Sequence, residues 1–271
     1  MNILYVGDIM GETGIQVVEQ LLLGIKNDKS VDLVIAQAEN VTAGRGISNN
    51  DYNRLVAAGV DFFTGGNHIF DTKEIYPKLN DAAAPIIRPA NYPKSTLGLG
   101  YKYIATKFGQ VLVISLLGQI VGKNASLALD NPLKVVDGIL AAQQQTPKAA
   151  TIVNFHGDFS SEKVIIGHYL DGRVTAVIGD HWHIPTADAR VLPKQTAHIT
   201  DVGMCGALNS SLGVTFDSVI PRWRDGIQTK NVLETTGPKQ FNAVLIKTNN
   251  QGLAISIEPI RRILEAIAPK L

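Results

Sequence analysis

At positions 63–70 the chain reads Phe63-Thr64-Gly65-Gly66-Asn67-His68-Ile69-Phe70. An apolar run ends here in two glycines, and an amide and an imidazole follow where the chain leaves its expected strand. Asn67 and His68 are costly to place behind a buried strand unless they have polar partners. The glycines allow a sharp turn and the close approach of another group. Two interpretations are open at this point: a turn before a capped helix, or the rim of a metal-centred phosphate site.

Two segments of the same kind precede this one and set the fold class. Apolar runs at 3–6, 31–36 and 60–64 have the composition of strands that are buried on both faces. Amphipathic helices are expected between them, over 15–25 and from the N-cap Ser48 to Ala58. A third helix is expected from Asp71 or Thr72 to Leu79. This β-α-β-α-β-α order predicts parallel strands with right-handed crossovers.

The pattern changes after residue 100. Strands are expected at 101–106 and 110–116 as a hairpin, then at 151–155 and 174–178, with helices at 131–145 and 160–170. The segment 184–238 reads as loop-rich, with a strand-like piece at 198–200; a hairpin of 242–248 and 254–260 and a short helix over 263–267 end the chain. The mixed order predicts one α/β domain over residues 1–271, with two sheets packed face to face and helices outside.

Composition limits the partners and the location. The chain has 271 residues, 25 of them Lys or Arg and 24 Asp or Glu, for a net charge of +1. This balance argues against an extended nucleic-acid or anionic membrane surface, and leaves a small phosphorylated ligand open. Cys205 is the only cysteine, so it cannot form an intramolecular disulfide and is expected to pack in the core. Without a signal-type segment or 18 consecutive apolar residues, we expect a cytoplasmic protein with no membrane association.

Five expected strand ends carry side chains that bind metals. They are Asp8; Glu39 with Asn40; Asn67 with His68; His156; and His181 with His183. In open α/β sheets, ligands bind beyond the carboxyl ends of the strands, so these groups should converge on one rim. His181 and His183 are two residues apart, and on a strand both imidazoles would face the same side.

The kinds of candidate ligand limit which metal ions the site could bind. Carboxylates, amide oxygens and imidazoles suit zinc, iron or manganese better than calcium or magnesium. Even without His68, the seven other candidate ligands are too many for one tetrahedral zinc and suit two ions that share a bridging carboxylate. A hydroxide held between ions about 3.5–4 Å apart would be a nucleophile at neutral pH. His68 should point away from a metal that Asn67 binds, so we expect it to protonate a leaving oxygen.

The motifs follow one another in the order of a known family. In sequence they are Gly7-Asp8-Ile9-Met10-Gly11; Ala38-Glu39-Asn40; Gly44-Arg45-Gly46-Ile47; Gly66-Asn67-His68; His156; Ser161-Glu162-Lys163; Tyr169-Leu170-Asp171-Gly172-Arg173; Gly179-Asp180-His181-Trp182-His183; Thr186-Ala187-Asp188; and Thr200-Asp201-Val202-Gly203-Met204. With these motifs the chain resembles the calcineurin-like metallophosphoesterases, and more narrowly the bacterial YmdB-like subfamily. The segments span nearly the whole chain.

The resemblance implies a four-layer αββα sandwich that hydrolyses phosphodiesters, notably 2′,3′-cyclic nucleotides. It implies two divalent or trivalent transition-metal ions, iron first, with manganese or zinc as alternatives, and a homo-oligomer, either a dimer or a tetramer. Carried over motif by motif, one metal is held by Asp8, Asn40 and His183, and the other by Asn67, His156 and His181. Glu39 would bridge them, a hydroxide between the metals would attack phosphorus, and His68 would be the general acid.

Two positions depart from the family pattern. Met10 stands where many metallophosphoesterases have the histidine of an Asp-x-His motif, and Asp180 stands where the subfamily often has threonine. We expect Asp180 at the rim, where Arg45 and Trp182 are further candidates for lining the substrate cleft.

The leading hypothesis is a dinuclear metal phosphodiesterase. The alternatives are a phosphomonoesterase or 5′-nucleotidase on the same centre, and a regulatory RNA-interacting protein with non-catalytic metals.

Overall fold

The first three apolar runs form the parallel side of a seven-stranded sheet, with the third run as its edge strand. In the computed structural model, which describes residues 1–122 and 125–265, β1 (Asn2–Val6) pairs in parallel with β3 (Leu33–Gln37), and β3 with β4 (Phe62–Thr64). The crossovers contain α1 (Gly11–Asp28) and α2 (Asn49–Ala57), as the sequence predicts. Short helical elements follow two of these strands: η1 (Thr42–Gly44) comes after β3, and η2 (Lys73–Ile75) and α3 (Tyr76–Asn80) come after β4.

Strands from the C-terminal part complete this sheet. β12 (Lys239–Thr248) pairs antiparallel with β1, β13 (Ala254–Leu264) and β11 (Met204–Ala207), and β11 pairs in parallel with β2 (Asp8–Ile9). The helix predicted over 263–267 is wrong at its start, because Ile263 and Leu264 pair with the first residues of β12. Positions 266–267 lie outside the described residues.

The second half of the chain builds a six-stranded sheet. Its order is β5 (Tyr101–Thr106), β6 (Gly109–Leu117), β7 (Ala150–His156), β8 (Ala176–Asp180), β10 (Ala197–Ile199) and β9 (Arg190–Val191). The four inner strands are parallel, and the two edge strands are antiparallel to their neighbours. The crossovers contain α4 (Pro132–Ala142) and α5 (Ser160–Tyr169). Asn131 caps α4, because its side chain accepts hydrogen bonds from two backbone N–H groups of the first turn.

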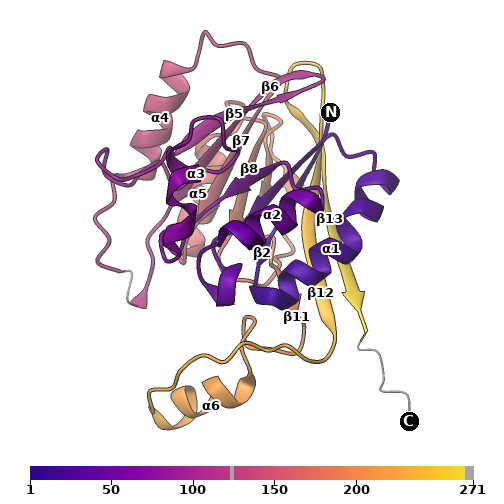
Figure 1. Cartoon of the computed structure of the whole chain (residues 1–271). Helices are drawn as coiled ribbons and strands as arrows, with labels where there is room; N and C mark the ends of the chain where they lie inside the picture. The colour runs from indigo at the N-terminus through magenta and orange to yellow at the C-terminus, as the bar shows by residue number, and fades with distance from the viewer. Residues whose placement is uncertain (123–124, 266–271) are drawn as a thin grey trace.

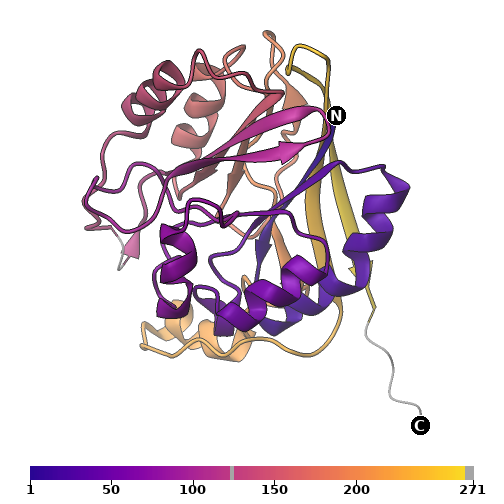
Figure 2. The same ribbon diagram turned by 45° about the horizontal axis from the view of Figure 1, so that its top comes forward.

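The two sheets pack face to face between layers of helices (Figure 1, Figure 2). Apolar side chains fill the space between the sheets, for example Ile3 and Ile35 from one and Ile152 and Ile178 from the other. Helices α1 and α2 cover the outer face of the seven-stranded sheet, while α4 and α5 cover that of the six-stranded sheet. The four-layer αββα prediction is therefore confirmed. Cys205 is buried in the apolar core between the seven-stranded sheet and its covering helices, as expected.

The segment that reads as loop-rich contains three short strands and a helix, α6 (Phe216–Asp225). In Figure 1 this orange helix lies apart from both sheets, at one end of the molecule. It is attached through Val219, which packs in a small cluster with Met10, Met204, Val214 and the partly buried Leu233. The sequence hides this helix because Pro221 lies inside it, and proline normally ends a helix.

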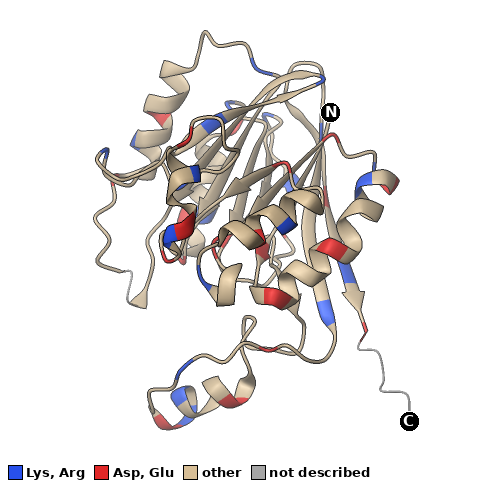
Figure 3. Cartoon of the chain, in the orientation of Figure 1, with Lys and Arg blue, Asp and Glu red and all other residues tan. Residues whose placement is uncertain are grey.

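Charged positions of both signs are spread over the fold (Figure 3). Lys and Arg positions are interspersed with Asp and Glu positions along the ribbon and are not gathered in one part of it (Figure 3). No helix among residues 1–122 and 125–265 is long and apolar enough to cross a membrane.

Candidate metal centre

The predicted ligands lie at the carboxyl ends of strands from both sheets. The seven-stranded sheet contributes Asp8 two residues after β1, Glu39 and Asn40 after β3, and Asn67 and His68 after β4. The six-stranded sheet contributes His156 at the end of β7, and His181 and His183 after β8. All of these are buried except His68 and His181, which are partly exposed. The parallel strands of the two sheets therefore bring together residues that are far apart in the sequence.

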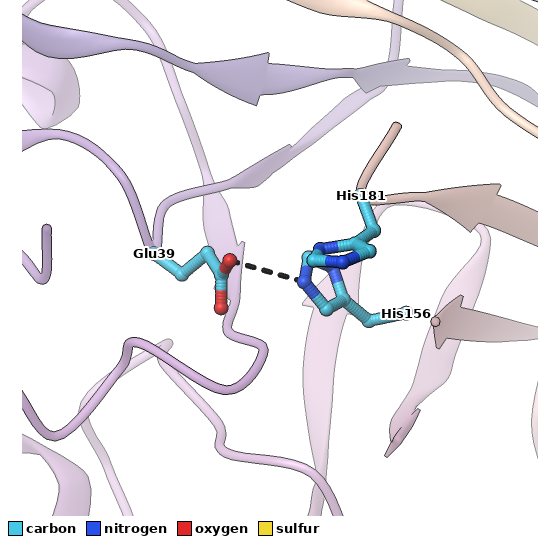
Figure 4. Close-up of side chains that lie close together, drawn as sticks. All are labelled: Glu39, His156 and His181. Carbon is cyan, nitrogen blue, oxygen red and sulfur yellow. Dashed lines mark ion pairs between the residues drawn. The ribbon is translucent and has the colours of Figure 1, made fainter. Parts of the chain in front are cut away.

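Glu39, His156 and His181 form the centre of this cluster (Figure 4). Each offers a ligand atom, and these atoms lie within 4.8 Å of one another. Glu39 Oε1 lies 3.0 Å from His156 Nε2, and the His156 and His181 ring centroids are 4.4 Å apart. Asn67 Oδ1 is 3.1 Å from the same His156 nitrogen. A carboxylate, an amide oxygen and imidazoles thus face one another at distances that a shared cation would suit.

A second group shares Glu39 with the first. Asn40 Nδ2 lies 3.2 Å from Glu39 Oε1 and 3.3 Å from His183 Nε2, which is 3.8 Å from Asp8 Oδ1. His183 Nδ1 donates a hydrogen bond to the backbone carbonyl of Leu212 at 3.1 Å. Since that carbonyl can only accept, the proton sits on Nδ1 and Nε2 is left for the cluster.

Asp8 provides a test of whether these residues fit a metal. Its Oδ1 is a buried acceptor that has no hydrogen-bond partner among the described residues. Burial and the nearby charge of Asp180 raise the pKa of Asp8 well above its usual value. A buried carboxylate oxygen that finds no N–H donor is costly unless a cation satisfies it. The donor set of imidazoles, carboxylates and amides therefore fits bound transition-metal ions.

The electrostatics of the cluster set the protonation of its members. Burial alone would raise the pKa of Glu39, but the charge and hydrogen bond of His156 lower it well below its usual value. Burial likewise disfavours a charged His156, but the carboxylates of Glu39 and Asp180 raise its pKa well above normal. A metal ion bound at His156 Nε2 would displace the proton from that nitrogen and leave the ring neutral. Burial lowers the pKa of His183 to about 4, so this imidazole is neutral at pH 7, as a metal ligand must be.

The loop that carries His181 and His183 has an uncommon backbone conformation. The sequence argument that placed both histidines on one face of a strand is wrong, because β8 ends at Asp180. His181 has a φ of 102° and His183 a φ of 62°, values that L-residues rarely adopt. Such strain persists only where the surroundings fix the backbone, and it clusters at functional sites.

A buried ion pair that the sequence analysis missed holds this loop. Lys163 Nζ donates to the Asp180 backbone carbonyl at 2.6 Å and pairs with Asp201 Oδ2 at 2.7 Å. The same Asp201 oxygen accepts the backbone N–H of Trp182 at 2.8 Å. Lys163 and Asp201 lie in family motifs, but a lysine inside a predicted helix normally indicates a solvated face.

Gly66 lies so close to the cluster that no side chain fits there. A Cβ on Gly66 would lie 2.6 Å from His156 Nε2 and would overlap Glu39 Oε2. The close approach that the two glycines of the octapeptide predict is therefore observed, and the approaching group is the proposed bridging carboxylate.

His68 stands beside the cluster with its own partner. Its backbone N–H donates to Glu39 Oε2 at 2.8 Å, and its Nδ1 lies 2.9 Å from Asp71 Oδ2. The Asp71 carboxylate holds a proton on Nδ1 and leaves the His68 Nε2 outside that bond. Arg45 Nη1 is 3.9 Å from the same Asp71 oxygen. Asp71 was not predicted from the sequence, although a residue three positions after His68 is within reach of its side chain.

One of the three residues expected to line a cleft, Asp180, has another position. Asp180 is fully buried and contacts His156 Nδ1, so its expected place at the rim is wrong. Asp180 is the last residue of β8, and its side chain points between the two sheets. The turn that follows β8 lies nearer the surface of the site. Trp182 is partly buried, and its indole N–H donates to the Asp158 carbonyl at 3.0 Å. The Asp158 carboxylate, also missed, lies 3.2 Å from His181 Nε2.

Arg45 does line a cavity. The cavity has a volume of about 570 Å³ and lies between η1 and the segment that follows α6. Its lining includes Met10 and the cationic side chains of Arg45, Arg222 and Lys230. Because Asp71 contacts both Arg45 and His68, the cationic side of this cavity adjoins His68.

Comparison with known proteins gives consistent matches over the whole chain. A family model described as YmdB-like protein matches residues 4–260. The 2′,3′-cyclic-nucleotide 2′-phosphodiesterase of Bacillus subtilis (strain 168) is 35% identical over 259 residues, which cover 95% of this chain and 92% of that one.

Solved structures agree with this match. A structure described as a novel phosphatase from Mycoplasma pneumoniae has a TM-score of 0.90 at 31% identity, covering 98% of this chain and 94% of that chain. A 5′-nucleotidase precursor from Thermus thermophilus shares the fold, with a TM-score of 0.55 at 11% identity, covering 98% of this chain and 54% of that chain.

Proposed function

This chain belongs to the YmdB-like protein family, and on that basis we propose that it is a metal-dependent phosphodiesterase acting on 2′,3′-cyclic nucleotides. Relatives named as a phosphodiesterase and a phosphatase support hydrolysis of phosphoric esters. The observation that carries the proposal is the convergence of Glu39, His156 and His181 at strand ends of both sheets. The name of the Bacillus subtilis relative supports the cyclic substrate.

The proposed cofactor is a pair of transition-metal ions, with iron first and manganese or zinc as alternatives. One ion would be held by Asp8, Asn40 and His183, the other by Asn67, His156 and His181, and Glu39 would contact both. Ions bound in this way supply Lewis acidity and a water molecule that deprotonates at neutral pH. The buried Asp8 oxygen, which has no hydrogen-bond partner among residues 1–122 and 125–265, supports this assignment.

The proposed role of His68 is proton donation to the leaving oxygen. Asp71 orients the His68 ring, and the partial exposure of that ring lets it meet a bound substrate. In hydrolysis of a 2′,3′-cyclic nucleotide, the oxygen of a water molecule would bond to phosphorus as the bond between phosphorus and O2′ breaks. O2′ would take the Nε2 proton of a His68 ring that is protonated on both nitrogens, its Nδ1 proton staying hydrogen-bonded to Asp71, and a nucleoside 3′-phosphate would be released. Arg45 and Lys230 in the adjoining cavity would attract the anionic substrate.

A comparison of substrates tests this function. The chain is stripped of metal with a chelator, reloaded with iron(II) or manganese(II), and assayed with 2′,3′-cyclic AMP and 5′-AMP. We expect turnover of the cyclic substrate only after reloading, with 3′-AMP as product. Preferential hydrolysis of 5′-AMP would instead assign a 5′-nucleotidase. Bound metal without hydrolysis of either substrate would favour the regulatory alternative.

We also propose that the chain forms a homo-oligomer through α6. This helix exposes Phe216, Ile220 and Trp223, with exposed fractions of 49%, 48% and 84%. A large apolar surface on a helix that lies apart from both sheets is typical of an interaction site. A second copy of the chain, as a dimer or a tetramer, is the proposed occupant.

A further inference from the structure

Asp180 lies directly beside one of the proposed metal ligands. Strands β7 and β8 are parallel neighbours, and their register places His156 opposite Asp180. Both side chains are fully buried, and His156 Nδ1 lies 2.6 Å from Asp180 Oδ1. The other ring nitrogen of His156, Nε2, faces Glu39 and Asn67 in the centre. The His156 ring therefore lies between the Asp180 carboxylate, at Nδ1, and the proposed metal centre, at Nε2.

Three other donors surround the same carboxylate. Asp180 Oδ2 accepts hydrogen bonds from the Tyr5 hydroxyl at 2.9 Å, the Gln37 amide at 3.1 Å and the Asn154 amide at 2.6 Å. Tyr5 and Gln37 come from the opposite sheet. With three donors on one oxygen and the imidazole on the other, Asp180 serves as an acceptor for every partner. The proton between Asp180 and His156 therefore belongs to His156 Nδ1.

The orientations of the two amide donors are themselves fixed. Gln37 Oε1 accepts the backbone N–H of Ala38 at 2.9 Å, which turns the Gln37 amide nitrogen towards Asp180. Asn154 Oδ1 accepts the Ser115 hydroxyl at 3.0 Å, which does the same for Asn154. The carboxylate of Asp180 is held in place, so it can hold the imidazole in place.

We infer that Asp180 is the positioning residue of the metal centre, which keeps the proton of His156 on Nδ1 and aims Nε2 at the metal. A metal-binding histidine commonly donates its other ring N–H to a carboxylate, which fixes the tautomer and the orientation of the ring. This inference rests on the proposed metal centre. It assigns to Asp180 a role through His156, with no contact to substrate.

The test is Asp180→Asn, which keeps the size of the side chain and removes its charge. If the new amide oxygen stays among the donors from Tyr5, Gln37 and Asn154, its NH₂ group faces His156 Nδ1. The ring proton must then move to Nε2, the nitrogen that the metal needs. We expect Zn²⁺ affinity, measured by competition with a chromophoric chelator, to fall about 10–100-fold. An Asp180→Asn chain that binds Zn²⁺ as tightly as the wild type would overturn the inference.

Nitrogen NMR of the imidazoles provides a readout that loss of stability alone would not mimic. In the Zn²⁺-loaded wild type we expect His156 to carry a proton on Nδ1 that exchanges slowly with water. A loaded wild type whose His156 carries its proton on Nε2 would contradict the inference without any variant. Asp158→Asn is the matched control, because it removes the carboxylate beside His181 and should leave the His156 Nδ1 proton in place.

Failure of the proposed function is distinguishable in the same experiment. A wild-type chain that binds no Zn²⁺, iron(II) or manganese(II) would overturn the metal centre and, with it, the role of Asp180. A chain that binds metal but loses none of its affinity in Asp180→Asn would overturn the role of Asp180 alone.

Discussion

His68 differs from the proposed metal ligands in how it meets the cluster. Its contact with Glu39 is made by the backbone N–H, while its imidazole pairs with Asp71 and stays 23% exposed. A histidine that is oriented yet accessible suits proton transfer to a substrate better than metal binding.

His68→Ala should therefore separate catalysis from metal binding. We expect kcat for 2′,3′-cyclic AMP to fall about 10²–10⁴-fold, because general acid catalysis contributes a factor of that size. Metal content, measured by elemental analysis, should not change. His168→Ala is the control, since His168 lies exposed on α5 and contacts Arg190. Unchanged turnover in His68→Ala would remove His68 from the mechanism.

Gly66 allows a second test at the residue scale. In Gly66→Ala the added Cβ would overlap Glu39 Oε2, so Glu39 and His156 must move apart. We expect weaker metal binding and a loss of about 1–3 kcal/mol in the free energy of unfolding, the usual cost of overpacking. Chelator competition and urea unfolding measure the two effects.

The matched control is Gly138→Ala in α4, where an added Cβ meets nothing within 4 Å. Its free energy of unfolding should stay equal or rise by up to about 1 kcal/mol, because alanine favours a helix. Equal metal affinity in the two variants would show that the contact of Gly66 with Glu39 has no role.

The sequence predicts where the cluster lies, but only part of what supports it. Polar residues directly after apolar runs indicate strand ends, so Asp8, Glu39 and His156 could be found. The partners Asp180, Lys163 and Asp201 could not, because their roles depend on strand register and on packing between layers. Lys163 in particular is fully buried, although a lysine in a helix is normally solvated.

At the scale of elements, prediction succeeds where periodicity is strong. The inner strands and the helices α1, α2, α4 and α5 follow from apolar patterns. Prediction fails for α6, which contains Pro221, and for the end of β13, whose exposed residues lack a clear alternation. The turn after β8 is also missed, since a positive φ at His181 is imposed by its surroundings.

Strand β10 carries a buried histidine that should make stability depend on pH. His198 Nδ1 donates to the Val177 carbonyl at 3.0 Å, and its ring lies against Gly167 of α5. Burial lowers the pKa of His198, whereas in the unfolded chain it should be about 6.5. Below about pH 6.5 the unfolded chain binds a proton that the folded chain does not, so the stability that His198 confers is lost as the pH falls.

The comparison of wild type with His198→Phe isolates this effect. As the pH falls below about 6.5, the free energy of unfolding of the wild type should decrease relative to the variant by up to about 1.4 kcal/mol per pH unit. Urea unfolding across about pH 5 to 7.5 measures the difference. Parallel curves for the two proteins would contradict a neutral, buried His198.

Helix α6 provides a prediction about assembly. Trp223 is 84% exposed, and in Figure 1 its helix lies apart from both sheets. If α6 is the contact between copies, Trp223→Glu should reduce the molar mass in solution to that of one chain, because a buried charge at an interface is unfavourable. Light scattering measures the mass. Phe108→Glu is the control. Phe108 is exposed at the turn between β5 and β6 of the six-stranded sheet, and this change should leave the assembly intact. A wild type of one-chain mass would overturn the proposal.

At the scale of the whole molecule, the centre joins the two sheets. The seven-stranded sheet supplies Asp8, Glu39 and the two asparagines, and the six-stranded sheet supplies the three imidazoles. Bound metal would therefore connect the layers, and ligand binding to the folded state stabilises the whole fold. The sequence predicts this architecture because both halves contain parallel strands, whose carboxyl ends lie at one edge. The relative position of these two edges, one in each sheet, depends on how the sheets pack, and the sequence pattern alone does not predict that packing.

The metal content of wild type and Glu39→Gln tests whether Glu39 is the centre of a two-metal site. Glu39 is fully buried, and its carboxylate faces both His156 and Asn40, so it is the proposed bridge. Glutamine keeps the size of the side chain and removes the charge that two cations would share. After loading with manganese(II), we expect about two ions per wild-type chain and clearly fewer in Glu39→Gln. Glu19→Gln, on the surface of α1, should keep the wild-type content. Full occupancy in Glu39→Gln would contradict a bridging carboxylate and a centre built around it.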